Sequence, residues 1–160
     1  MSETFAALAG VVLGFGLNEV AAFLRRRAED RRRSGAAKLL IRAEGDHNIE
    51  LLTRLAKTID DEQKEDAASP ANMHLPAFLG RIAIPAWSHV LWENQLAAAA
   101  HALAPEAIRR IHRFHSDLDT ITELVQTIRE NESQVTYRKE LYDECVALMH
   151  SILAGGNPAA

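Results

Sequence analysis

The side chains best suited to metal or acid–base chemistry begin with one glutamate–histidine pair. Glu44 and His47 have the Glu-x-x-His spacing, which puts both ligands on one face of a helix in di-iron carboxylate bundles. Such a site also needs a second pair and two further glutamates, and the sequence has no second pair. Gly45 lies between the two residues of the Glu44–His47 pair. We therefore interpret Glu44 and His47 as a chance pair with solvent-facing side chains, and we expect no metal and no cofactor.

A second group of candidate ligands follows on a later amphipathic segment. His112 and His115 are three residues apart, with Asp117 and Asp119 close by. No third ligand has the spacing of a zinc site, so we expect one exposed and one packed histidine. Cys145 is the only cysteine, which excludes an internal disulfide and is typical of a reducing compartment. It lies on an apolar stripe and is expected to be a packed core thiol.

The charge of the chain argues against a nucleic-acid partner. The formal net charge is −4; residues 1–24 contribute −2 and residues 25–33 contribute +4, so the remaining body carries −6. A nucleic-acid-binding domain is normally basic. The sequence also contains neither G-x-x-x-x-G-K-[ST] nor G-x-S-x-G, so neither a phosphate-binding loop nor a hydrolase nucleophile is indicated.

One spacing nevertheless resembles a nuclease family. Arg110 and His115 form R-x4-H, similar to the HEPN-type ribonucleases, small helical bundles in which two protomers build a composite RNA-cleaving site. In that family a polar residue usually follows the arginine, whereas Ile111 follows it here. Membrane-anchored HEPN-like proteins that accompany RNA-targeting CRISPR effectors assemble into pores, and this resemblance implies a structural or regulatory pair. We assign no catalytic residue and keep Arg110 and His115 as the alternative site.

The elements that would position these residues begin with an apolar segment, Phe5–Leu24, in which only Asn18 and Glu19 are strongly polar. About 20 apolar residues are what a helix needs to cross a bilayer core, and glycine, present three times here, is common in membrane helices. Glu19 lies six residues before Arg25, near the headgroup level, where a charge costs less. The segment predicts a transmembrane helix. A buried core helix of a soluble bundle is the alternative, because the polar pair shortens the uninterrupted apolar run.

A cluster of arginines follows the predicted span and sets its orientation. Lys and Arg close to a span favour the cytoplasmic side. We therefore expect a single-pass protein of the cell inner membrane, with the N-terminus outside and the C-terminal body in the cytoplasm. Near an anionic surface each arginine contributes about 1 kcal/mol through lipid headgroups. The six residues assigned to headgroup contact are Arg25, Arg26, Arg27, Arg31, Arg32 and Arg33.

Small residues on the predicted span indicate self-association. Ala6, Gly10, Gly14 and Asn18 are spaced by four, so they form one stripe along which a second helix can approach closely. The Asn18 amide can donate across such a contact, and Glu19 is better placed toward a neighbouring helix or a wet lumen than toward lipid. We therefore expect a homo-oligomer with these five residues at the contact.

Four amphipathic helices are expected behind the anchor, because apolar residues recur three to four positions apart. The first has weak points at Gly35 and Gly45 and ends near residue 60. Its stripe comprises Leu39, Leu40, Ala43, His47, Leu51, Leu55 and Ile59. The second begins at Pro85, a residue suited to a first helical turn, and Trp87 is expected to be buried in it.

The two remaining stripes are the clearest. One follows Pro105 and comprises Ile108, Ile111, Phe114 or His115, Leu118, Ile121, Leu124 or Val125, and Ile128. The other, within residues 134–153, comprises Val135, Leu141, Tyr142, Cys145, Leu148, Met149 and Ile152. The sequence thus predicts an all-α fold: an N-terminal transmembrane helix followed by a cytosolic helical bundle of about four helices. Residues 1–33 are the anchor with its juxtamembrane arginines, 34–153 the bundle with a long loop at 61–85, and 154–160 a tail.

The order of these elements resembles small bacterial single-span membrane-anchored helical-bundle proteins of unassigned function. Besides the anchor and the arginines, the resemblance rests on Pro-Ala-Trp at 85–87 and Ala-Pro-Glu at 104–106. It implies an anchor and a bundle, and no chemistry. The favoured function is therefore non-enzymatic assembly or partner binding by a membrane-anchored bundle. An oligomeric membrane pore or effector in phage defence is one alternative, and a soluble helical-bundle enzyme with a HEPN-type RNase site is the other.

Overall fold

Five helices make up the regular structure of the described chain. The computed structural model describes residues 2–67, 75–131 and 134–159, with side chains from residue 15 onward except at 65–67, 75–77 and 135. The helices are α1 (Ser2–Ala67), α2 (Leu75–Arg81), α3 (Val90–Ala99), α4 (Pro105–Glu130) and α5 (Val135–Gly155). No strand occurs among these residues. The all-α prediction is confirmed.

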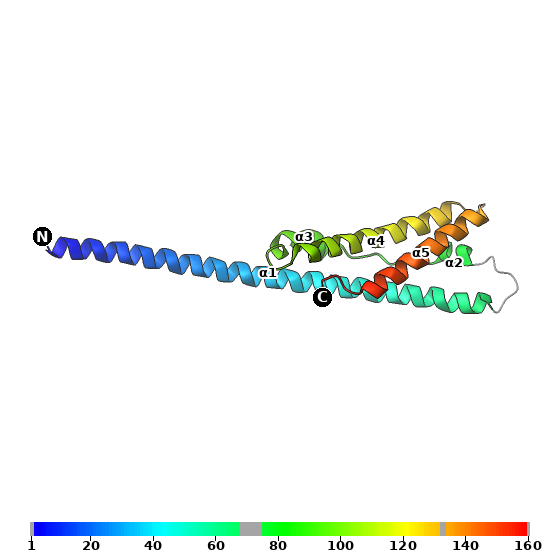
Figure 1. Cartoon of the computed structure of the whole chain (residues 1–160), viewed down its shortest axis with the longest axis horizontal. Helices are drawn as coiled ribbons and strands as arrows, with labels where there is room; N and C mark the ends of the chain where they lie inside the picture. Colours follow the sequence, from blue (N-terminus) through cyan, green and yellow to red (C-terminus); the bar gives the residue numbers. More distant parts are fainter. Residues whose placement is uncertain (1, 68–74, 132–133, 160) are drawn as a thin grey trace.

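The first helix, α1, runs unbroken for 66 residues. Its second half lies in the bundle, whereas its N-terminal part extends alone beyond the other helices (Figure 1). The weak points expected at Gly35 and Gly45 do not interrupt it. Gly45 makes room for the C-terminal tail, since a Cβ there would lie 2.7 Å from Asn157 Oδ1. Asn157 Nδ2 donates to the Arg42 carbonyl oxygen at 2.9 Å and to Asp46 Oδ1 at 2.7 Å, which ties the tail to α1.

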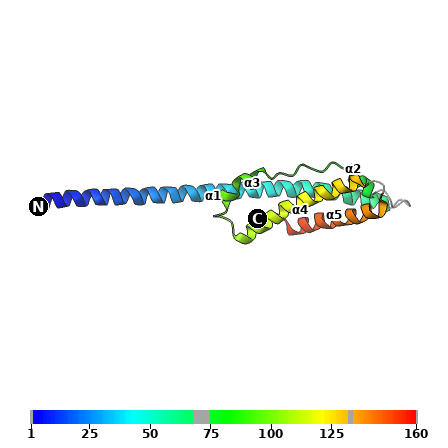
Figure 2. The ribbon, with the colours of Figure 1, turned by 90° about the horizontal axis from the view of Figure 1, so that it is seen from above.

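In the bundle, α3 packs on α1, α4 pairs with α5 in antiparallel fashion, and α2 lies against both α4 and α5 (Figures 1 and 2). The apolar stripes predicted for the last two helices are confirmed for most of their members, which form the main core together with the C-terminal half of α1. Fully or almost fully buried members are Leu52, Leu55 and Ile59 of α1, Phe114, Leu118, Ile121, Val125 and Ile128 of α4, and Leu141, Tyr142, Cys145, Met149 and Ile152 of α5. Ile108 and Ile111 instead pack in a second cluster with Ile41 and Trp92, and the Val135 side chain lies outside the described residues.

The stripe predicted for residues 39–59 is wrong in its first half. Leu39 and Leu40 are 68% and 42% exposed, and His47 is exposed as well. Within residues 39–59, two positions on the true inner face, Glu44 and Asn48, hold polar side chains, so hydrophobicity alone points to another face. The buried residues of α1 are Ser34, Ala37, Ile41, Glu44, Gly45, Asn48, Leu52, Leu55, Ala56 and Ile59.

The long loop predicted at 61–85 is shorter in the structure. Residues 61–67 continue α1, and Leu75–Arg81 form α2; residues 68–74 lie outside the described part. The charged residues after Asp60 suit an exposed helix end, where Lys64 Nζ lies 3.2 Å from Asp61 Oδ1. The end of α2 is held by Arg129 of α4, whose guanidinium donates to the carbonyl oxygens of Gly80 and Ile82, both at 2.6 Å.

The helix expected from Pro85 begins only at Val90, and residues 83–89 are non-helical. Trp87 is therefore half-buried rather than buried: its ring packs on the main core, and its Nε1 donates to Thr122 Oγ1 at 3.0 Å. The buried tryptophan is Trp92, which is 7% exposed. The late start of α3 follows from a contact supplied by α1.

Candidate functional site

Glu44 is a carboxylate on α1 that is only 2% exposed. Its Oε1 accepts hydrogen bonds from Ser88 Oγ at 2.6 Å and from the Leu91 N–H at 2.9 Å, and its Oε2 accepts from the Trp92 N–H at 2.6 Å. Leu91 and Trp92 lie in the first turn of α3, whose own N-cap residue, His89, makes no side-chain cap hydrogen bond. Glu44 therefore caps α3 from another helix, satisfying two otherwise unpaired amides and complementing the helix dipole.

Asn48, one turn further along α1, holds the segment before α3 and is fully buried. Its Nδ2 donates to the Ser88 carbonyl oxygen at 2.8 Å, and its Oδ1 accepts from the Ser88 N–H at 2.9 Å. With the bond to Glu44, Ser88 is fixed by three hydrogen bonds to α1. The prediction of a solvent-facing Glu44 is wrong for this reason, whereas His47 is exposed, so the two side chains do not converge.

Two histidines and an aspartate extend this polar cluster. His115 Nδ1 and His89 Nδ1 are 3.0 Å apart, and His89 Nε2 lies 3.3 Å from Asp119 Oδ1. A hydrogen bond between the two Nδ1 atoms needs a proton on one of them, because a neutral imidazole has one N–H donor and one acceptor nitrogen. The His115 ring is stacked on Trp92 with centroids 5.8 Å apart, and Phe114 meets it edge-on at 5.4 Å.

His115 is a neutral imidazole at physiological pH. It is 5% exposed, and burial, followed by the neighbouring His89, lowers its pKa from 6.5 to about 4. The predicted division into one packed and one exposed histidine is confirmed, with His112 exposed. Aromatic rings cover the His115 ring, and its Nδ1 contacts the Nδ1 of His89. This environment is typical of a packed core histidine. No group of three His, Cys, Asp or Glu side chains in the described ranges converges to hold a metal ion.

Cys145 is the packed core thiol that the sequence predicts. It is fully buried, and burial raises the pKa of the thiol to about 12. A thiol of this kind is neither ionised nor accessible at physiological pH, so it is not a nucleophile.

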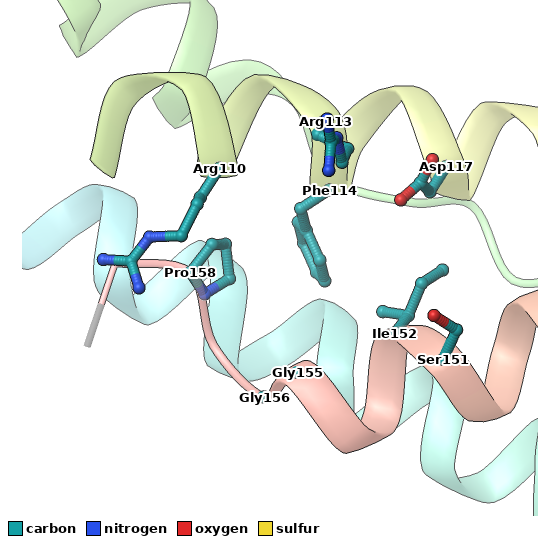
Figure 3. A pocket seen from close by; sticks show the side chains of 9 residues that line it. All are labelled: Arg110, Arg113, Phe114, Asp117, Ser151, Ile152, Gly155, Gly156 and Pro158. Carbon is teal, nitrogen blue, oxygen red and sulfur yellow. The ribbon is translucent and has the colours of Figure 1, made fainter. Parts of the chain in front are cut away.

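The two members of the R-x4-H pair serve different parts of the structure. Arg110 is exposed and lines a pocket of about 200 Å³ between α4 and the end of α5, with Arg113, Asp117 and Ser151 (Figure 3). Its side chain extends toward the C-terminal tail (Figure 3), whereas His115 is buried against α3. Within one chain the two side chains do not meet.

A larger groove lies where the arginine cluster meets the end of α3. Its volume is about 790 Å³. Arg27, Arg31 and Arg33 line it together with Asp30, all from α1, and His101 lines it from beyond α3. The other three arginines of the cluster do not line it. Its lining is therefore mainly basic.

The predicted self-association stripe lies on the part of α1 that extends beyond the bundle. The side chains of Ala6, Gly10 and Gly14 are outside the described residues, and Asn18 and Glu19 are exposed. In the part of the chain whose side chains are described, no helix is both long enough and apolar enough to cross a membrane. Half of the predicted span, residues 5–14, falls outside that part.

The sequence does not single out Asn48, Ser88 or His89, which complete the polar cluster. The sequence does contain a signal for Asn48, because Glu44 and Asn48 continue the spacing from Ile41 to Leu52 on one helix face. Polar residues on an otherwise apolar face indicate a buried hydrogen-bond network. Nothing in the residue types around Ser88 and His89 announces that a non-helical segment packs there.

Comparison of the chain with protein-family models, with curated proteins and with solved structures finds no match.

Proposed function

We propose that the protein is a membrane-anchored assembly or partner-binding protein, with residues 5–24 crossing the membrane and the helical bundle on the cytosolic side. The observation that carries the proposal is the apolar surface of α1 outside the bundle. Five large apolar side chains there are more than half exposed: Phe15, Leu17, Val20, Phe23 and Leu24.

Such a surface is costly in water. Burying one large apolar side chain contributes about 1.5–3 kcal/mol, so these five would contribute roughly 10 kcal/mol in an apolar environment. Exposed apolar surface of this kind marks a membrane or protein contact. Arginines begin immediately after Leu24, which favours a membrane and sets the bundle on the cytosolic side.

The bundle offers support for binding rather than for catalysis. Its buried polar side chains are committed to the fold: Glu44 and Asn48 hold Ser88 and the start of α3, and His115 is packed between aromatic rings. Leu39 and Leu40 meanwhile project from α1 into solvent. An exposed apolar pair next to the anchor suits a contact with another protein or with a second copy of the chain.

A second candidate is an oligomeric membrane pore or effector. Asn18 and Glu19 are exposed and interrupt the apolar surface of α1. Inside a membrane, an amide and a carboxylate favour a neighbouring helix or a water-filled lumen over lipid. Measurement of dye leakage from cells that express the chain distinguishes the candidates, because only a pore admits the dye, and Glu19→Leu should then abolish the leakage.

Carbonate extraction of membranes from expressing cells tests the anchor. The full chain is expected in the carbonate-resistant membrane fraction and to need detergent for release. Leu17→Arg with Val20→Arg is the matched perturbation: both side chains are exposed, so the fold of the bundle is unaffected, but the membrane fraction should lose the protein. Recovery of the unaltered chain in the carbonate-soluble fraction would refute the anchor.

A further inference from the structure

The groove between the arginine cluster and α3 has the size of a ligand site. Its volume of about 790 Å³ falls within the range of roughly 300–1,000 Å³ typical of small-molecule pockets. One wall is α1, the other is the end of α3, and His101 follows that end. The groove is therefore large enough to hold a small polar group.

The lining of the groove has the chemistry of an anion site. Three arginines against one aspartate leave a net charge of +2. No ion pair of Arg27, Arg31 or Arg33 is formed within the described ranges, Asp30 included. An arginine guanidinium presents paired N–H donors that match phosphate geometry, and the His101 ring adds a further donor from the opposite wall.

The height of the groove relative to the anchor identifies the source of the anion, and this step rests on the proposed membrane span. At 1.5 Å per residue, Arg27 lies about 4.5 Å and Arg31 about 10 Å beyond Leu24, the last apolar residue of the span. The polar headgroup layer is roughly 5–8 Å thick on each side of the hydrocarbon core. Arg27, at one end of the groove, thus lies within the headgroup layer, and Arg31 lies just beyond it on the cytosolic side.

We propose that the groove between Arg27, Arg31, Arg33 and His101 binds the phosphate of an anionic phospholipid headgroup. A lipid held there bridges α1 and the end of α3, and so fixes the bundle against the inner surface of the membrane. The chain itself provides the comparison that separates this site from diffuse attraction of basic residues to an acidic membrane. Arg27, Arg31 and Arg33 line the groove, and the other three arginines of the cluster do not.

Two triple variants remove the same charge from the same stretch of helix. The groove variant is Arg27→Gln, Arg31→Gln and Arg33→Gln. The matched control is Arg25→Gln, Arg26→Gln and Arg32→Gln, which leaves the groove intact. Diffuse electrostatics weaken equally in both, since each loses three positive charges within nine residues. A specific phosphate-binding site is lost only in the groove variant.

Native mass spectrometry of the full chain in neutral detergent, with phosphatidylglycerol or phosphatidylcholine added, measures the retained lipid. The parent chain and the control are expected to retain phosphatidylglycerol at least about tenfold more strongly than phosphatidylcholine, and the groove variant is expected to lose that preference. Equal loss in both variants, or no loss in either, would overturn the site.

Soluble glycerophosphoglycerol, titrated into the same samples, separates a lipid headgroup from a free phosphate compound. Binding at least tenfold weaker than that of the lipid is expected, since the acyl chains contribute to retention. Binding as tight as that of the lipid would overturn the lipid assignment. Carbonate extraction tests the membrane anchor independently of lipid binding, because the groove variant should stay in the carbonate-resistant fraction. A carbonate-soluble parent chain would refute the span, whatever amount of lipid the chain retains.

Discussion

Removal of the Glu44 carboxylate is the sharpest perturbation of the bundle. In Glu44→Ala, the N–H groups of Leu91 and Trp92 lose their acceptor. A buried donor left unpaired costs about 1–3 kcal/mol, and the Ser88 hydroxyl loses its acceptor too. The expected loss is about 3–5 kcal/mol, a large share of the roughly 5–15 kcal/mol that stabilises a typical domain.

Two further variants grade this effect. Glu44→Gln keeps one oxygen acceptor but replaces the other oxygen by an NH₂ group, a donor that would face a backbone N–H. About half of the loss in unfolding free energy is therefore expected. His47→Ala, three residues away and exposed, should change the free energy of unfolding by less than about 0.5 kcal/mol.

Urea unfolding of the full chain in neutral detergent, followed by far-ultraviolet circular dichroism, gives these free energies. A Glu44→Ala variant within about 1 kcal/mol of the parent chain, or no worse than His47→Ala, would refute the reasoning that α3 depends on a cap from α1. A double-mutant cycle with Ser88→Ala isolates the carboxylate–hydroxyl bond and should show coupling.

Three other predictions concern single features. The pKa of His115 falls from 6.5 to about 4 on folding, so the unfolded chain binds a proton at higher pH than the folded chain does. The free energy of unfolding should therefore fall by about 2 kcal/mol from pH 7 to pH 5. In urea titrations, His115→Leu should lack this dependence of the unfolding free energy on pH. Trp87→Ala should cost about 2–3 kcal/mol, less than a fully buried tryptophan, because the ring is half-buried and bonded to Thr122; a loss under 1 kcal/mol in the same urea assay would contradict this. Gly10→Leu with Gly14→Leu should preserve membrane insertion but weaken self-association in detergent, and an unchanged assembly by crosslinking would place the contact elsewhere.

Apolar periodicity identifies the bundle where packing is purely hydrophobic. On α4, Ile111, Leu118, Ile121 and Ile128 are buried as predicted, because each faces another apolar side chain and nothing else competes for that face. The same rule misplaces the inner face of α1 at Leu39, because Glu44 and Asn48 on the true inner face are polar and are buried through hydrogen bonds to Ser88 and the first turn of α3.

The candidate site is predictable only in part for the same physical reason. Glu44 and Asn48 are buried because they satisfy the amides and carbonyl of residues 88–92, and no local pattern in residues 83–89 states that this segment is non-helical. The proline at 85 suggests a helix start there, yet the cap that decides the start comes from a residue more than 40 positions earlier. The grouping of Arg27, Arg31 and Arg33 into a groove likewise depends on the end of α3.

The central claim, that residues 5–24 cross a membrane with the bundle on the cytosolic side, is tested most directly by cysteine accessibility. Cys145 is buried with its pKa raised to about 12, so it does not react with a maleimide in the folded chain. Single cysteines at Ser2→Cys and at the exposed Glu140→Cys then report the two sides of the membrane. With a membrane-impermeant maleimide on intact spheroplasts, Ser2→Cys should be labelled at once and Glu140→Cys only after lysis. Labelling of both only after lysis would contradict the account.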